Sequence, residues 1–156
     1  MTEKVDRSKL IIPAVAPLYE GLSCVAYPLM RIVVGGFLIP HGMQKLFGAF
    51  GGGGLEGTAA GFAKMGLEPA SLMAILAGGT EFFGGILIAL GLFTRIAAAG
   101  AVILLLVASI HVHYANGFFA GKGGYEYALL WAVMAFYVFV RGGGHCSIDR
   151  KIGKEF

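Results

Sequence analysis

The chain has 156 residues, of which 57% are apolar and only 13% are charged, and its mean hydropathy is +0.78. In a soluble domain roughly a quarter of the residues are charged, so this composition excludes a water-soluble globular domain. The net charge of +3 comes from basic residues that flank apolar stretches, as in proteins that face an anionic membrane surface. No alternation of aromatic and basic residues marks a nucleic-acid groove, so the expected partner is the lipid bilayer and not a nucleic acid.

Residues 1–21 are predicted to form a leader that is retained, because charged residues precede a short apolar run, 10–18, that two prolines interrupt. A cleavable signal peptide has a longer uninterrupted apolar region. The leader is either a short helix in the membrane interface or a loosely ordered segment, and the sequence leaves both open.

Four apolar stretches follow, each close to the roughly 20 residues that a helix needs to cross the hydrocarbon core. We therefore predict an all-α membrane protein, a bundle of four transmembrane helices with an amino-terminal interfacial segment. The helices are expected at about 22–47, 69–92, 94–113 and 125–141, with a basic tail at 142–156. Pro40 should kink the first helix, and Gly91 to Arg95 should form a tight hairpin.

The distribution of Lys and Arg predicts the orientation, with Arg31 left out as buried. Eight lie on one side of the predicted membrane and three on the other: Lys4, Arg7, Lys9, Arg95, Arg141, Arg150, Lys151 and Lys154 against Lys45, Lys64 and Lys122. Basic residues are retained on the cytoplasmic side, so both chain ends are expected in the cytoplasm of a multi-pass protein of the inner (plasma) membrane. The loops 48–68 and 114–124 are then external.

Two ionisable residues, Arg31 and Glu81, fall near the middle of adjacent predicted helices. A charge at that depth is costly unless it faces the bundle interior and has a partner, so we predict a midplane ion pair between them. The pair could be purely architectural, fixing which helices dock, or Glu81 could be a carboxylate that exchanges protons or acts together with a quinone.

Glycines flank Glu81 on the same face of the second helix, since Gly78 and Gly85 lie three and four residues from it. Small residues let helices approach closely in a membrane. This face is predicted to pack on the first helix around Gly35 and Gly36.

A second polar cluster is predicted toward the outer face, where His41, Gln44 and Lys45 share one face of the first helix. His111 near the end of the third helix and Glu126 at the start of the fourth lie at a similar depth. Such a cluster of side chains could bind a metal, a haem or the head group of a quinone. No pair has the Glu-x-x-His spacing of helical di-iron bundles, so no metal is expected, and a bundle this small leaves little room for a haem. A quinone needs only one or two donors, an aromatic wall and access from lipid. His113 and His145 are expected to be ordinary interfacial residues.

Several motifs resemble one known family. They are RIVVGGFLIPHGMQKLFGAFG at 31–51, EFFGGILIALGLFTR at 81–95, His111, NGFF at 116–119, Glu126-Tyr127 and the tail at 142–149. Together they resemble the DoxX family of small four-helix membrane proteins, over about residues 25–150.

The resemblance implies a fold and a location more directly than a reaction. The family is similar to the membrane subunit of a thiosulfate:quinone oxidoreductase, and its members include redox-complex and assembly proteins. It implies functional positions at His41, Lys45, Glu81, His111 and Glu126, and Arg31 matches its motif. Three functions follow as hypotheses: a subunit of a membrane redox system that binds quinone, a scaffold or assembly factor for a larger membrane complex, and a small transporter.

Overall fold

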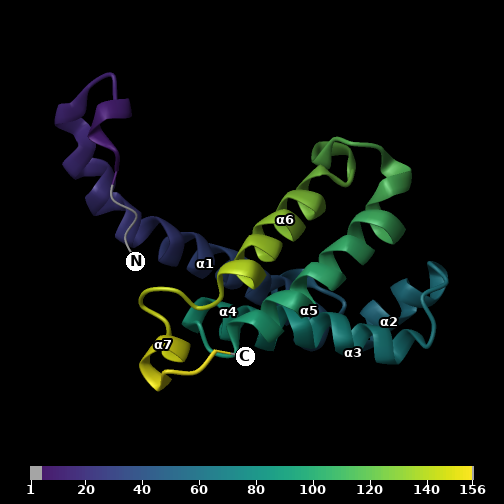
Figure 1. Ribbon diagram of the computed structural model, residues 1–156. Helices are drawn as coiled ribbons and strands as arrows, with labels where there is room; N and C mark the ends of the chain where they lie inside the picture. Colours follow the sequence, from purple (N-terminus) through teal and green to yellow (C-terminus); the bar gives the residue numbers. More distant parts are fainter. Residues whose placement is uncertain (1–4, 156) are drawn as a thin grey trace.

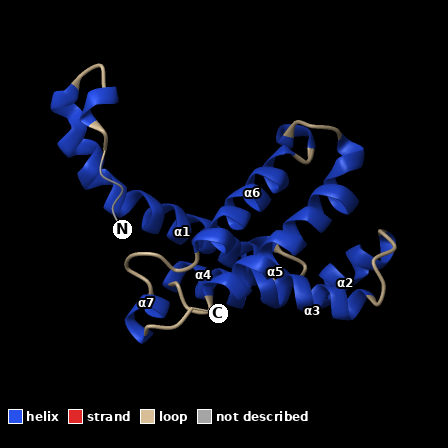
Figure 2. Ribbon diagram, viewed as in Figure 1, coloured by secondary structure: helices blue, strands red, loops and turns tan. Residues whose placement is uncertain are grey.

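The computed structural model describes residues 5–155, and within that range the regular structure is helical, with no strand (Figures 1 and 2). Three of the described segments are long and apolar enough to cross a membrane: Pro13–Phe47, Ala70–Leu90 and Thr94–Asn116. The all-helical membrane class is thus confirmed, while a fourth crossing remains a prediction. Residues 1–4 of the leader, with Lys4 of the orientation count, and Phe156 of the tail lie outside the described residues.

The first helix is longer than predicted, because α1 runs over Ala16–Phe47 and follows a 3-10 turn at Pro13–Val15. The second half of the leader, from Pro13 on, and the first apolar stretch are therefore one nearly continuous helical segment that includes Pro28 and Pro40. Its amino-terminal part projects away from the other helices, and its second half packs within the bundle (Figure 1).

The predicted loop 48–68 contains a helix that we did not predict from the sequence. α1 ends at Gly48, whose φ of 69° is the left-handed conformation typical of a helix carboxyl terminus. After a 3-10 turn at Ala49–Gly51, α2 runs over Gly54–Lys64 and packs on α1 and α3.

The next two helices form a hairpin, and each contains a π-helical turn. The first consists of α3 (Ala70–Gly79), a π turn (Thr80–Gly84) and α4 (Gly85–Leu90). The second consists of α5 (Thr94–Val107), a π turn (Ala108–His113) and a 3-10 turn (Tyr114–Asn116). The connection is tight because Gly91 and Phe93 both have positive φ, 69° and 47°.

The last helices are α6 (Glu126–Arg141) and the short α7 (Ile148–Ile152). The tail that contains α7 folds back onto the hairpin, where Asp149 is buried. Its carboxylate accepts hydrogen bonds from the backbone N–H of Phe93 (2.8 Å) and Thr94 (3.0 Å) and from the Thr94 hydroxyl (2.6 Å). A carboxylate at this position caps the amino terminus of α5. The predicted basic tail is thus a packed part of the fold.

Small residues hold the bundle together. A Cβ on Gly35 would lie 2.4 Å from the backbone oxygen of Gly85, so α1 and α4 touch through their backbones as the glycine pattern predicts. Gly36 has no atom within 4 Å of such a Cβ and faces away from this contact. α5 and α6 pack through alanines, including Ala98, Ala101, Ala132 and Ala135.

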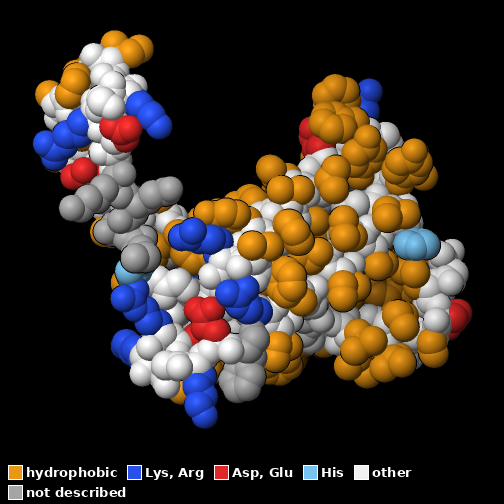
Figure 3. Space-filling view, in the orientation of Figure 1, with side chains coloured by type: hydrophobic (Ala, Val, Ile, Leu, Met, Phe, Trp, Pro, Cys, Tyr) orange, Lys and Arg blue, Asp and Glu red, His pale blue; other side chains and the backbone are white. Residues whose placement is uncertain are grey.

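Large apolar side chains cover the visible outside of the bundle (Figure 3). A group of basic side chains is instead gathered at one end, around α7, and others lie on the projecting amino-terminal segment. This division fits a molecule whose flanks contact lipid and whose charged end lies at the membrane surface.

Candidate functional site

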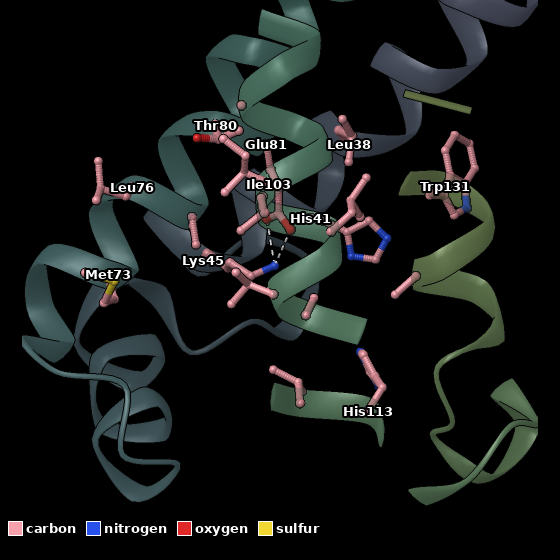
Figure 4. A pocket seen from close by; sticks show the side chains of 18 of the residues that line it. Leu38, His41, Lys45, Met73, Leu76, Thr80, Glu81, Ile103, His113 and Trp131 are labelled. Carbon is pink, nitrogen blue, oxygen red and sulfur yellow. Dashed lines mark hydrogen bonds and ion pairs between the residues drawn. The ribbon is translucent and has the colours of Figure 1, made fainter. Parts of the chain in front are cut away.

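A cavity of about 480 Å³ lies within the bundle, between α1, α3 and its π turn, α5 and α6 (Figure 4). Most of its lining is apolar. The acidic, basic and histidine side chains that reach it are His41, Lys45, Glu81 and His113. A mostly apolar pocket with a few converging polar groups is the usual form of a small-molecule site.

An ion pair between Lys45 and Glu81 forms the polar wall of this cavity (Figure 4). The Lys45 Nζ lies 2.6 Å from Oε2 and 2.8 Å from Oε1 of Glu81, so both carboxylate oxygens accept from it. Glu81 is only 7% exposed, and a buried carboxylate at membrane depth needs such a partner. Lys45 is supplied by the last turn of α1, from which its long side chain reaches inward.

The two π turns border the cavity. Glu81 belongs to the turn Thr80–Gly84, and His113 ends the turn Ala108–His113. A π turn adds one residue to a helical turn and so rotates the side chains that follow, and such turns are frequent at functional sites. In this protein both place a polar residue on the cavity wall.

An aromatic group lies beside the ion pair. The Phe37 and Trp131 rings are 5.5 Å apart, and the Tyr127 ring is 5.8 Å from that of Trp131. His41 is one turn before Lys45 on α1 and lies between the ion pair and Trp131 in the view of Figure 4. The site thus combines a charge-balanced pair, an imidazole and an aromatic wall.

The structure does not contain the predicted ion pair between Arg31 and Glu81, because each of the two residues has another partner. Arg31 is buried as predicted, but its Nη1 and Nη2 donate to the carbonyl oxygens of Ile88 and Cys146, each at 3.0 Å. It therefore ties the end of α4 to the carboxyl-terminal tail.

The register of the two helices explains the error. Gly35 lies against Gly85, and Gly42 lies against Phe82. Residue numbers therefore rise along one of the two antiparallel helices as they fall along the other. Arg31 is then opposite the hairpin, about eleven residues or ~16 Å along the helix from Glu81. The prediction set the start of the first helix, residue 22, level with the end of the second, residue 92, whereas the observed register sets Arg31 level with Gly91 in the hairpin.

The predicted outer cluster does not assemble as a whole. His41 and Lys45 reach the cavity, but His111 is exposed and is not part of the lining. Gln44 packs against Gly52 of the following loop. Glu126 accepts a hydrogen bond of 2.6 Å from the backbone N–H of Ala120 and so orders the loop before α6.

His113 lines the cavity, although the sequence predicted it to be an ordinary interfacial residue. Its Nδ1 lies 2.8 Å from the Gly123 oxygen, which orients the ring. His111 and His113 are two residues apart on a helix and point in different directions, and the sequence held no signal for which one faces inward. Among residues 5–155, no three His, Cys, Asp or Glu side chains come together as a metal site.

The fold and this cavity define a helical membrane protein with an ion-paired pocket between its helices. The DoxX family model matches residues 27–114, more than half of the chain, and the chain therefore belongs to the DoxX family.

Relatives support this assignment along most of the chain. An uncharacterized protein of Haemophilus influenzae is 35% identical over 133 residues, which cover 81% of this chain and 90% of the relative. A Bacillus subtilis protein named "Putative oxidoreductase CatD" is 33% identical over 121 residues, 78% of this chain and 82% of the relative. No solved structure matches the chain.

Proposed function

We propose that the cavity binds the head group of a quinone and that the chain is the membrane subunit of a redox system. The observation that carries this proposal is the Lys45–Glu81 pair on the wall of an otherwise apolar cavity. An ammonium has three N–H donors, and the two Glu81 oxygens account for two of them. The third is available to a ligand carbonyl.

The charge and shape of the site favour a neutral, flat and partly apolar ligand. Lys45 and Glu81 balance each other's charge, so an ionic ligand gains little from the pair. Phe37, Tyr127 and Trp131 offer ring faces and edges against which a planar head group can stack. One relative is named an oxidoreductase, which agrees with a redox role.

The proposed setting is the inner membrane, with both chain ends in the cytoplasm and other protein subunits of the complex as partners. The bias of Lys and Arg toward the end that holds the tail supports this orientation.

Tryptophan fluorescence gives a direct test, because Trp131 is the single tryptophan of the chain and lines the cavity. A short-chain benzoquinone titrated into the purified protein in mild detergent should quench this fluorescence saturably. His41→Ala, and the double variant Lys45→Gln with Glu81→Gln, should raise the Kd about tenfold, the equivalent of one hydrogen bond of about 1.4 kcal/mol.

His111→Ala is the matched control, since His111 is exposed and does not line the cavity. Its Kd should equal that of the wild type. Quenching that rises linearly without saturation, or an equal loss of affinity in His111→Ala, would show that the cavity is not a quinone site.

A further inference from the structure

A second hollow, of about 360 Å³, lies at the charged end of the molecule, where α6 ends and α7 follows. Its walls include four basic side chains: Arg141, His145, Arg150 and Lys154. They come from two elements and the segments that follow each of them, so the tail must fold as observed to bring them together. Figure 3 shows basic side chains gathered at this end, beside the apolar flank of the bundle.

The hollow is also lined by two carboxylates, those of Asp149 and Glu155, and both are engaged with groups outside it. Asp149 caps the amino terminus of α5 at Phe93 and Thr94. Glu155 lies 3.2 Å from the Nη2 of Arg95, whose Nη1 donates to two carbonyl oxygens at the end of α6. Among residues 5–155, no carboxylate lies within ion-pair distance of Arg141, Arg150 or Lys154. The hollow therefore has excess positive charge.

The protonation state of His145 agrees with a positive potential in the hollow. Arg150 donates to its Nδ1, which requires the neutral imidazole. The charge of Arg150 is the main cause that lowers the pKa of His145, and desolvation and the charge of Arg141 add to it. The Arg141 guanidinium is itself held 5.4 Å above the Tyr27 ring. An anion that entered the hollow would meet oriented donors.

We propose that this hollow binds a phosphate group, from either an anionic membrane lipid or a soluble phosphate compound. Guanidinium groups match phosphate oxygens with paired N–H donors, and a lysine adds a point charge. The hollow lies where the bundle meets the membrane surface, and basic pockets at that level accept the head groups of anionic lipids. A lipid whose phosphate occupies the hollow could lay its acyl chains along the apolar flank.

The lipid source is tested by native mass spectrometry of the full chain in neutral detergent. Phosphatidylglycerol and phosphatidylcholine with the same acyl chains are titrated separately. Phosphatidylglycerol should bind about tenfold more tightly, and Arg150→Gln should remove most of that preference. Lys151→Gln is the matched control, because it removes the same charge from the neighbouring exposed residue, which does not line the hollow. It should change the affinity less than about twofold.

The soluble source is tested with inorganic phosphate in the absence of added lipid, by following the His145 ring signals in NMR titrations. Bound phosphate should raise the pKa of His145, because it offsets the charge of Arg150. A raised pKa without a preference for phosphatidylglycerol would assign the site to soluble phosphate compounds. The proposal is overturned if neither phosphate nor phosphatidylglycerol binds selectively, or if Lys151→Gln weakens binding as much as Arg150→Gln.

Discussion

Two of the buried charges, those of Glu81 and Arg31, are bound by different kinds of partner. Glu81 is bound by the ammonium of Lys45, whereas Arg31 is bound by two backbone carbonyls. The Arg31 Nε has no hydrogen-bond partner among the described residues. Arg31 is therefore an architectural residue that joins α4 to the tail, and Glu81 belongs to the cavity.

This assignment predicts which substitutions compensate each other. Lys45→Met should lower the free energy of unfolding by about 3 kcal/mol, because Glu81 loses its partner in a buried position. Lys45→Met combined with Glu81→Met should recover most of that loss, since no buried charge then lacks a partner. The measurement is unfolding in mixed micelles, analysed as a double-mutant cycle.

Arg31→Met should also destabilise the protein, by freeing the carbonyls of Ile88 and Cys146. Adding Glu81→Met should give no recovery, because Arg31 and Glu81 are not partners. Recovery in this pair, and none in the Lys45 pair, would restore the midplane ion pair that the sequence predicted.

At the scale of elements, the helices depend on close backbone contact more than on large apolar side chains. The approach of α1 to α4 at Gly35 and of α1 to the π turn at Gly42 leaves no room for a Cβ. The π turn Thr80–Gly84 lies on this interface, so the same contact that packs the helices also positions Glu81.

Adjacent glycines on α1 provide a test of this packing. Gly35→Ala should destabilise the fold by about 1–3 kcal/mol, because the new Cβ meets the backbone of α4, which cannot move aside. Gly36→Ala meets nothing and should be neutral or slightly stabilising, since alanine favours helix more than glycine does. Thermal unfolding of the two variants in detergent makes the comparison, and equal stability would mean that the close contact contributes nothing.

For the molecule as a whole, the length of the first helical segment is informative. Pro13–Phe47 has 35 residues, which as a helix extend about 52 Å, while the hydrocarbon core is about 30 Å thick. The segment must therefore tilt strongly or leave the hydrocarbon core. The exposed Leu18, Leu22, Val25 and Leu29 form one apolar stripe on the projecting part, which suits contact with the membrane interface.

The first half of α1 and the carboxyl-terminal tail meet at the charged end of the molecule. The Tyr27 hydroxyl donates to the Gly142 oxygen, which connects α1 to the start of the tail. Cys24 and Cys146 are both exposed near this contact and make the arrangement testable. A membrane-impermeant maleimide should label both thiols from the same face of sealed vesicles, and the basic residues predict that this face is cytoplasmic.

Single-thiol variants, Cys24→Ser and Cys146→Ser, separate the two signals. Lys122→Cys in a variant without both native thiols is the control, since it lies in the loop before α6 and should react from the opposite face. Labelling of Cys24 and Cys146 from opposite faces would disprove the shared location of the first half of α1 and the tail.

The sequence by itself determined that this is a membrane protein, that it is helical and that it contains the hairpin. These follow from local properties: the length of apolar runs, the glycine at a helix end and the spacing of small residues on one face. Motifs around His41 and Glu81 also pointed to the family. Each of these signals is contained within a single segment, which is why no tertiary information was needed.

Only the tertiary structure decided which polar groups meet. The partner of Glu81 depends on the register of two antiparallel helices, and that register depends on where each helix begins and how closely the backbones approach. The inward turn of His113, the helix α2 and the cap that Asp149 places on α5 depend on contacts between segments far apart in the chain. Such contacts leave no periodic trace in sequence, because a single well-placed side chain is sufficient to make each of them.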